Sequence, residues 1–315
     1  MLKPNREFLL LLSALLVLAY ATSAQPGQTK PIRTVTIPIS IFTKQELKER
    51  RAEEFVQADT LIVREDNEEQ TILSIRSVTE TPLSIAIVIQ EDLSSGFNLQ
   101  LKDIADFIRG LPRGTRVMVA YAKAGSPQVT QRFTDDLDTA AKSLRIVTGN
   151  AATGPRNPYE SVQDIVGRFD ALPAGRRAIL LFSDGLDATG GLSLASVSQS
   201  FDLDQAILKA QRRSVAVYSF YHPTPATENG NSVITLGAQG ALQKLSDETG
   251  GRAFFNGSIA PVSFLPFFKD LSLSLNRQFA LTYVTTHMNK GYHKVNVNST
   301  NPEVKIEHPK GYYYR

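Results

Sequence analysis

The sequence predicts an α/β fold with a doubly wound, mostly parallel sheet, joined to a β-sandwich-like module made from the N- and C-terminal flanks. Continuous apolar stretches alternate with helical patterns between residues 84 and 276, and strands separated by helices form parallel sheets covered on both faces. Period-two alternation before and after this region is typical of strands with one polar face. An α/β domain therefore lies between two β-rich flanks.

Residues 1–24 have the layout of a secretory signal peptide. Lys3 and Arg6 precede an apolar run over residues 8–19, and small residues follow it, which predicts cleavage after Ala24 or Ala21. Retention as a membrane anchor is the alternative, because the uncharged stretch approaches the lower limit for a span, ~17 residues. We expect an exported protein, periplasmic or extracellular, with no membrane span after cleavage.

Composition excludes several classes of function. The chain has no cysteine, which excludes disulfides, thiolate catalysis, cysteine-ligated zinc and a lipoprotein anchor. The formal net charge is +3, and loss of residues 1–24 removes two cations and one anion. A net charge this close to zero gives no reason to expect a nucleic-acid partner.

Residues 25–80 are predicted to form an N-terminal β module after a short polar linker. Residues 34–42 are rich in β-forming residues, and Pro38 within them favours an edge strand. The charged segment 44–54 is typical of a solvated helix. Strands at 61–63 and 71–78 flank a polar turn.

Residues 81–276 are predicted to form the α/β domain. Its strands are expected at 84–90, 116–122, 178–183 and 214–220, and its helices at 99–111, 135–147, 158–172, 202–213, 238–249 and about 262–276. Asn157 before Pro158 is a helix start signal. Residues 277–315 return to period-two alternation, and we expect these strands to join the N-terminal module.

The chain resembles von Willebrand factor type A (VWA) domains. The resemblance rests on a strand ending near "QEDLSS", a helix begun by "RNPYESV", the turn "LLFSDGLD" and the closing "LSDETGGRAFF". It covers nearly all of residues 32–315, because the flanks resemble those of exported bacterial proteins built around this domain. The resemblance implies a Rossmann-like sheet and a metal-ion-dependent adhesion site, in which a D-x-S-x-S loop, a threonine and an aspartate hold Mg²⁺.

This chain departs from that ligand pattern. Gln90, Asp92 and Ser94 stand where Asp, Ser and Ser are expected, so only Ser94 matches in the first loop. Arg156 takes the place of the threonine, and Asp184 matches the third position unchanged. Gln90 offers a neutral oxygen, and a permanent cation at position 156 would repel Mg²⁺. We therefore expect a metal-free site without a cofactor, in which Arg156 pairs with Asp92 and Asp184.

Two other alignments keep Mg²⁺ open as a disfavoured alternative. Thr153 is the loop ligand if the alignment slips by three residues, which gives a metal set of Asp92, Ser94, Thr153 and Asp184. Sliding the first loop by two residues instead gives Asp92, Ser94 and Gly96.

The function expected is partner binding at the carboxyl edge of the sheet, where open α/β folds bind ligands. The candidate residues of this degenerate adhesion site are Gln90, Asp92, Ser94, Ser95, Arg156, Asp184 and Asp187. The partner is expected to be an unidentified protein whose acid docks on Arg156. The alternatives are a Mg²⁺-dependent adhesion module and a structural envelope protein with a vestigial site.

Enzyme function is not expected, because the sequence lacks the common nucleophile, phosphate-binding and metalloprotease motifs. A hydrolase would need His222 brought to Ser183. His287 and His293 could meet across a hairpin and bind metal, against the alternative that both are surface residues. The Pro- and Gly-containing segment Tyr221–Val233 is interpreted as a loop after a sheet strand.

Overall fold

The computed structural model describes eight stretches of the chain, and several sequence predictions fall outside them. The described residues are 31–44, 61–78, 81–149, 157–173, 175–189, 200–228, 232–257 and 259–314. The predicted signal peptide, most of the charged segment 44–54, Thr153 and Arg156 therefore lie outside the described residues.

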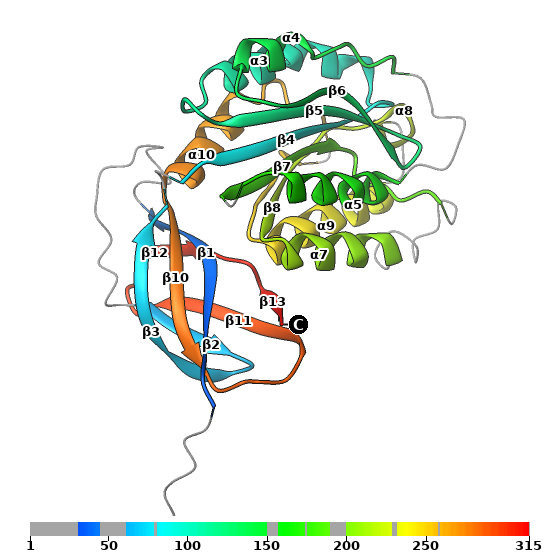
Figure 1. Ribbon diagram of the computed structural model, residues 1–315. Coiled ribbons are helices and arrows are strands. Elements are labelled where there is room, and N and C mark those ends of the chain that lie inside the picture. The colour runs from blue at the N-terminus through cyan, green and yellow to red at the C-terminus, as the bar shows by residue number, and fades with distance from the viewer. Residues whose placement is uncertain are drawn as a thin grey trace, which may run out of the picture.

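A six-stranded mixed sheet forms the centre of the α/β unit (Figure 1). Its order is β6-β5-β4-β7-β8-β9, with β6 antiparallel to β5 and the other neighbours parallel. The strands are β4 (Leu83–Gln90), β5 (Arg116–Lys123), β6 (Ser126–Thr134), β7 (Arg176–Ser183), β8 (Val215–Tyr221) and β9 (Ala253–Phe254). Four of them match the predicted strands closely.

Helices cover both faces of this sheet. They are η2 (Ser95–Gln100), α3 (Leu101–Arg109), α4 (Leu137–Lys142), α5 (Pro158–Arg168), η3 (Phe169–Ala171), α7 (Phe201–Arg212), α8 (Pro225–Glu228), α9 (Ser232–Thr249) and α10 (Leu265–Asn276). One core joins alternate residues of β4, such as Ile87, to α3, α4 and α10, and the other joins Val88 to α5, α7 and α9. Because every residue of β4 is buried, its sequence is a continuous apolar run.

Strand β6 was not predicted, for a reason visible in its sequence. Its nine residues, "SPQVTQRFT", alternate between exposed and half-buried positions and include no apolar run. An antiparallel edge strand with a solvated face needs no such run. The helix predicted at 135–147 is also shorter, since α4 ends at Lys142.

Both ends of the chain build a second, seven-stranded antiparallel sheet of order β12-β1-β10-β3-β2-β11-β13 (Figure 1). Its strands are β1 (Arg33–Thr43), β2 (Leu61–Glu65), β3 (Glu68–Ser77), β10 (Gln278–Thr285), β11 (Gly291–Ser299), β12 (Val304–Glu307) and β13 (Gly311–Tyr314). The sheet curls around one core that includes Ile37, Val63 and Tyr283. It is a single curled sheet, where the sequence predicted a sandwich-like module.

Pro38 lies on a part of β1 with one neighbouring strand. It pairs with Ala280 of β10, whereas β12 pairs only with residues from Ser40 to Thr43. A proline costs no ladder hydrogen bond where one side of the strand is unpaired. The edge position expected from the sequence therefore applies to this half of β1 only.

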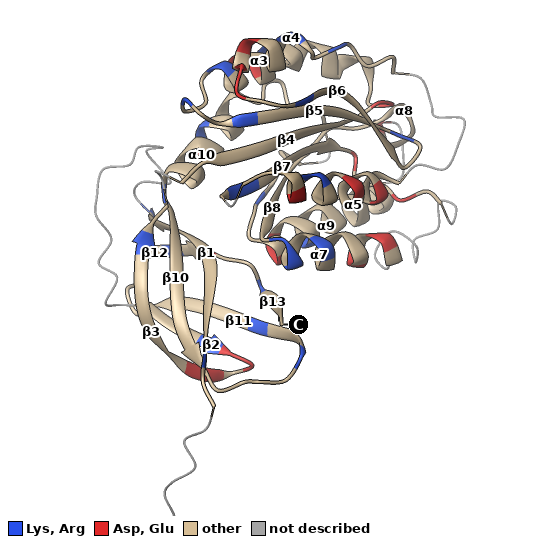
Figure 2. Ribbon diagram, viewed as in Figure 1, with Lys and Arg blue, Asp and Glu red and all other residues tan. Residues whose placement is uncertain are grey.

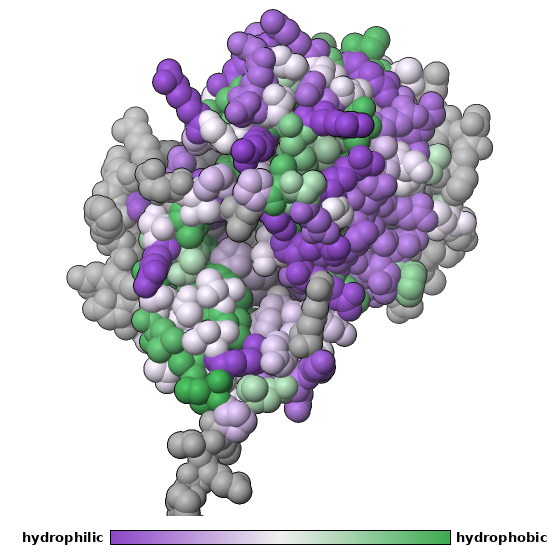
Figure 3. Space-filling model, in the orientation of Figure 1, coloured by the Kyte–Doolittle hydropathy of each residue, from purple (hydrophilic) through white to green (hydrophobic). Residues whose placement is uncertain are grey.

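Across all the described helices, none has the length and apolar character needed to cross a membrane. In the view of Figure 3, hydrophilic residues cover α5 and α7, and neutral and hydrophobic residues show over the seven-stranded sheet.

Candidate functional site

The candidate site lies at the carboxyl edge of the mixed sheet, where β4 and β7 end. Gln90 is the last residue of β4 and Ser183 the last of β7, and the two strands run parallel in register from Leu83↔Arg176 to Ile89↔Phe182. The polar residues that follow both strands therefore meet at one edge.

Gln90 joins the two strand ends through its side-chain amide. Its Oε1 accepts hydrogen bonds from the Ser183 hydroxyl at 2.5 Å and from the Asp184 backbone N–H at 3.2 Å. Its Nε2 donates to Asp92 Oδ1 at 2.9 Å. The backbone donor on one side and the carboxylate on the other fix the orientation of the amide.

Asp184 is fully buried and held on both carboxylate oxygens. Oδ1 accepts from the Leu186 backbone N–H at 3.0 Å, and Oδ2 accepts from the Thr224 hydroxyl at 2.8 Å. A buried carboxylate needs such donors, because it is costly to remove from water without them. Thr224 comes from the segment after β8, so a third strand end contributes to the site.

The first loop is closed by the segment that contains α8. The Ser94 hydroxyl donates to Glu228 Oε2 at 2.8 Å, and the Ser94 backbone N–H donates to the Pro223 carbonyl at 2.9 Å. Ser94 is buried, whereas its neighbour Ser95 is exposed. Ser95 and Gly96 are thus the exposed residues of this loop, and Ser95 offers a side chain to a partner.

Asp187 belongs to a different local arrangement. Its Oδ1 accepts from the backbone N–H and hydroxyl of Thr189, and its Oδ2 accepts from the Ser200 hydroxyl at 2.5 Å. Ser200 is also the N-cap of α7 through the Leu203 N–H. Asp187 therefore positions the start of a helix.

Acidic residues gather beside this edge. Figure 2 shows red segments where α5 and α7 begin; the first turn of α5 contains Glu160, and that of α7 contains Asp202 and Asp204. Asn157 caps α5 through the Tyr159 and Glu160 N–H groups, as the sequence predicted, and donates to Asp202 Oδ2 at 2.7 Å. The described part of the edge is negatively charged.

Two buried tyrosines respond to these charges. Burial, with the charges of Asp184 and Asp187, raises the pKa of Tyr159 well above its ordinary value. Burial, with the charge of Asp184, raises the pKa of Tyr221 to about 12. Both phenols stay neutral near neutral pH, and the Tyr159 hydroxyl donates to the Gly185 carbonyl at 2.7 Å.

The structure brings together part of the predicted set. Gln90, Asp92 and Asp184 form one hydrogen-bonded group, Ser94 joins Glu228, and Asp187 lies with Ser200. Arg156 lies outside the described residues. Its pairing with Asp92 and Asp184 stays a prediction.

Sequence reasoning missed three residues that complete the group: Ser183, Thr224 and Glu228. The first adjoins Asp184 and was considered only as a nucleophile. The other two lie in the segment interpreted as a loop, where α8 now occupies Pro225–Glu228.

Ser183 and His222 make hydrogen bonds to other groups, in place of the serine–histidine pair that a hydrolase would need. The Ser183 hydroxyl donates to Gln90, and His222 Nδ1 lies 3.1 Å from the Pro223 carbonyl. Burial lowers the pKa of His222, and its ring packs edge-on against Phe97. The Ser183 hydroxyl and His222 Nδ1 are thus both used within the fold.

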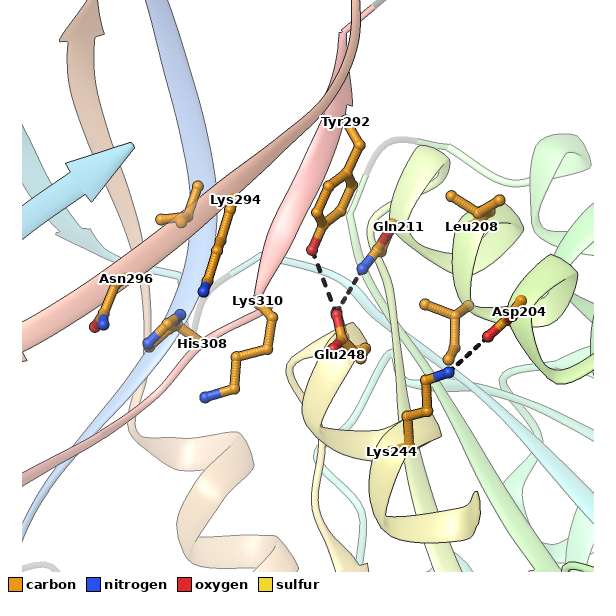
Figure 4. A pocket seen from close by; sticks show the side chains of 12 residues that line it. Asp204, Leu208, Gln211, Lys244, Glu248, Tyr292, Lys294, Asn296, His308 and Lys310 are labelled. Carbon is orange, nitrogen blue, oxygen red and sulfur yellow. Dashed lines mark hydrogen bonds and ion pairs between the residues drawn. The ribbon is translucent and has the colours of Figure 1, made fainter. Parts of the chain in front are cut away.

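A separate cavity of about 740 Å³ lies between the mixed-sheet unit and the antiparallel sheet (Figure 4). Helices α7 and α9 line one side of it, and β11 and residues near β13 line the other. Tyr292 donates to Glu248 Oε2 at 3.3 Å, and Lys244 pairs with Asp204 at 2.7 Å. None of the predicted site residues that the structure describes lines this cavity.

No protein-family model and no curated protein matches the chain. Several solved structures are partly similar. A von Willebrand factor type A protein from Catenulispora acidiphila has 11% identity and a TM-score of 0.42, covering 92% of this chain and 75% of its own. The conserved hypothetical protein BatB from Bacteroides thetaiotaomicron has 14% identity and a TM-score of 0.43, covering 61% of this chain and 97% of its own.

A mutant of the PilB minor pilin from Streptococcus sanguinis has 12% identity and a TM-score of 0.46, covering 62% of each chain. Similarity at this level carries no argument about function, so we infer function from the residues of this chain.

Proposed function

We propose that the chain is an exported, non-enzymatic interaction module that binds a protein partner at the carboxyl edge of its mixed sheet. In this proposal the edge is a degenerate VWA-type adhesion site that works without Mg²⁺. Export rests on the signal-like pattern of residues 1–24, with Lys3 and Arg6 before an apolar run.

The Gln90 amide is the observation that carries the proposal. Its Nε2 donates to Asp92 at 2.9 Å while its Oε1 accepts from Ser183 and from the Asp184 backbone. A metal ligand must present an oxygen lone pair to the ion, whereas this amide presents N–H groups toward Asp92. A hard cation beside Asp92 would have to displace that hydrogen bond.

The other side-chain oxygens that could ligate Mg²⁺ also make hydrogen bonds within the protein. Asp184 accepts from Leu186 and Thr224, and the Ser94 hydroxyl donates to Glu228. Mg²⁺ would have to share these oxygens with their present donors, and each contact of a buried group that it broke would cost about 1–3 kcal/mol. This arrangement favours a structural use of the former ligand positions.

The kind of partner proposed follows from the positive charge that Arg156 would bring to the edge. If Arg156 neutralises Asp92 and Asp184, its guanidinium offers a docking point for a carboxylate of the partner. The exposed Ser95 lies on the first loop of the same edge. A partner acid near it would be repelled by a new negative charge.

The test is quantitative capture from the envelope fraction of the source organism, using the parent chain and charge variants, with the retained proteins measured by mass spectrometry. Arg156→Glu and Ser95→Glu are expected to reduce capture at least tenfold. Thr300→Glu is the matched control, because Thr300 is also exposed but lies beyond β11 of the other sheet.

Two outcomes would overturn the proposal. Unchanged capture by a folded Arg156→Glu variant would remove the edge from consideration and favour a structural envelope role. Capture that is lost in EDTA and restored by Mg²⁺ would favour the metal-dependent adhesion module.

A further inference from the structure

A cluster of two histidines and two carboxylates lies in the antiparallel sheet, where the β2–β3 turn meets the connection between β10 and β11. Glu65, Asp66, His287 and His293 each place one potential ligand atom there, and these atoms all lie within 4.8 Å of one another. The cluster belongs to the other sheet from the partner-binding edge.

The distances within the cluster match the spacing of ligands around a tetrahedral ion. His287 Nδ1 lies 3.2 Å from Glu65 Oε1 and 3.6 Å from Asp66 Oδ2. His293 Nδ1 lies 3.4 Å and 2.8 Å from the same two oxygens. Zinc–ligand bonds of about 2.0–2.1 Å in a tetrahedron place neighbouring ligand atoms about 3.3 Å apart.

Both imidazole rings are oriented by their outer nitrogens. His293 Nε2 lies 2.7 Å from the Asn289 carbonyl, and His287 Nε2 lies 3.0 Å from Glu68 Oε2. Because each acceptor requires an N–H on Nε2, a neutral ring carries its lone pair on Nδ1, toward Glu65 and Asp66. Metal-binding histidines make these outer contacts to carbonyls and carboxylates.

The two carboxylates are also held in place. Glu65 is fully buried, and its oxygens accept from the Tyr283 hydroxyl at 2.7 Å and the Thr285 hydroxyl at 3.0 Å. Asp66 Oδ1 accepts from the Lys294 backbone N–H at 2.9 Å, which leaves Oδ2 directed toward His293. The side chains therefore need no rearrangement to converge on a common point.

Charge in the cluster is unbalanced when both rings are neutral. Among the described residues around the cluster, Glu65, Asp66 and Glu68 are the acids, and Arg33, whose Nη2 lies 3.6 Å from Glu65 Oε1, is the cation. One divalent ion would balance the remaining two negative charges. Balance matters here because Glu65 and His293 are almost completely removed from solvent.

We propose that Glu65, Asp66, His287 and His293 bind a divalent ion of the zinc class. Two imidazole nitrogens and two carboxylate oxygens suit zinc or its first-row neighbours, whereas Mg²⁺ and Ca²⁺ prefer oxygen ligands throughout. Asp66 is 40% exposed, so the ion can reach the site from solvent. Once bound, it would cross-link the β2–β3 turn to the β10–β11 connection and stabilise the curled sheet.

The test uses the chain without a histidine tag, freed of metal with a chelator and titrated with Co²⁺ and then Zn²⁺. We expect one equivalent of Co²⁺ to give the intense visible bands of a tetrahedral site, and Zn²⁺ to displace it and raise the melting temperature. His287→Ala and Asp66→Asn should abolish the bands. Glu68→Gln should weaken Zn²⁺ binding about 10- to 100-fold, because it removes an outer contact.

Glu69→Gln is the matched control, since Glu69 follows Glu68 in β3 but pairs with Arg64 at 3.8 Å and is 65% exposed. It should bind both metals like the parent. Absence of saturable binding to the parent would overturn the proposal, as would the weak bands of six-coordinate Co²⁺ or parent-like binding by His287→Ala. The parent spectrum decides the question even where a variant fails to fold.

Discussion

At the scale of single residues, Gln90 and Asp184 show how the edge is organised. Gln90 joins β4 to β7 through a buried amide that both accepts and donates, and Asp184 is held by Leu186 and Thr224. A satisfied buried network of this kind is rigid, because each lost partner leaves an unpaired group. Gln90 and Asp184 thereby connect strand ends.

His308 makes a residue-scale prediction about pH. Val297 N–H donates to its Nε2 at 3.2 Å, and its Nδ1 lies 2.9 Å from the Pro309 carbonyl, so the folded state needs a neutral ring. Burial, with the charge of Lys310, lowers the pKa of His308 below its ordinary 6.5. The unfolded chain takes up a proton first, so stability is present above pH 6.5 and is lost as pH falls toward the folded pKa.

We expect His308→Gln to flatten this dependence. Urea unfolding of parent and variant between about pH 8 and about pH 5 measures it, and the parent should lose up to about 1.4 kcal/mol more per pH unit below the ordinary histidine pKa. Equal slopes for the two proteins would show that His308 does not titrate with unfolding.

At the scale of elements, the sequence predicted the four strands of the mixed sheet that are buried on both faces and missed β6 and the two-residue β9. β4 and β7 read as continuous apolar runs because helices cover both of their faces. β6 has one solvated face and a proline near its start, so neither its length nor its pairing could be inferred. Local hydrophobic patterns therefore identify buried strands better than they identify which strands pair with each other.

The same limit applies to the candidate site. Asp92 and Asp184 were found because each follows a strand that the apolar pattern marks. Thr224 and Glu228 were not found, because their contacts join residues far apart in sequence. Thr224 lies 40 residues from Asp184, and Glu228 lies 134 residues from Ser94. The meeting of His287 and His293 beside Glu65 was open from sequence alone, since it depends on strand register across the curled sheet.

At the scale of the whole molecule, the two flanks of the chain build the antiparallel sheet and the middle builds the mixed sheet with its helices. Side-chain contacts join these two units in addition to the covalent chain. Arg252, between α9 and β9, donates from Nε to Glu307 Oε1 of β12 at 2.7 Å. Both side chains are mostly buried, at 18% and 11% exposure. Arg212 of α7 also lies over the Tyr313 ring, at 4.3 Å from its centroid.

Glu307→Gln should therefore weaken the joint between the units. It removes the charge of a partly buried ion pair, and we expect a loss of about 1–3 kcal/mol in the free energy of unfolding. Glu303→Gln is the control, because Glu303 pairs with Lys44 at 3.8 Å while 67% exposed, and exposed pairs contribute about 0–1 kcal/mol. Denaturant titration compares the two, and equal losses would contradict a special role for Glu307.

We propose that the carboxyl edge of the mixed sheet works without Mg²⁺. Isothermal titration of the parent chain and of Asp184→Ala with Mg²⁺ tests this proposal, because the VWA resemblance places Asp184 unchanged at a ligand position. We expect the parent to show no saturable Mg²⁺ binding that depends on Asp184. Micromolar Mg²⁺ binding to the parent that is abolished in a folded Asp184→Ala variant would contradict it.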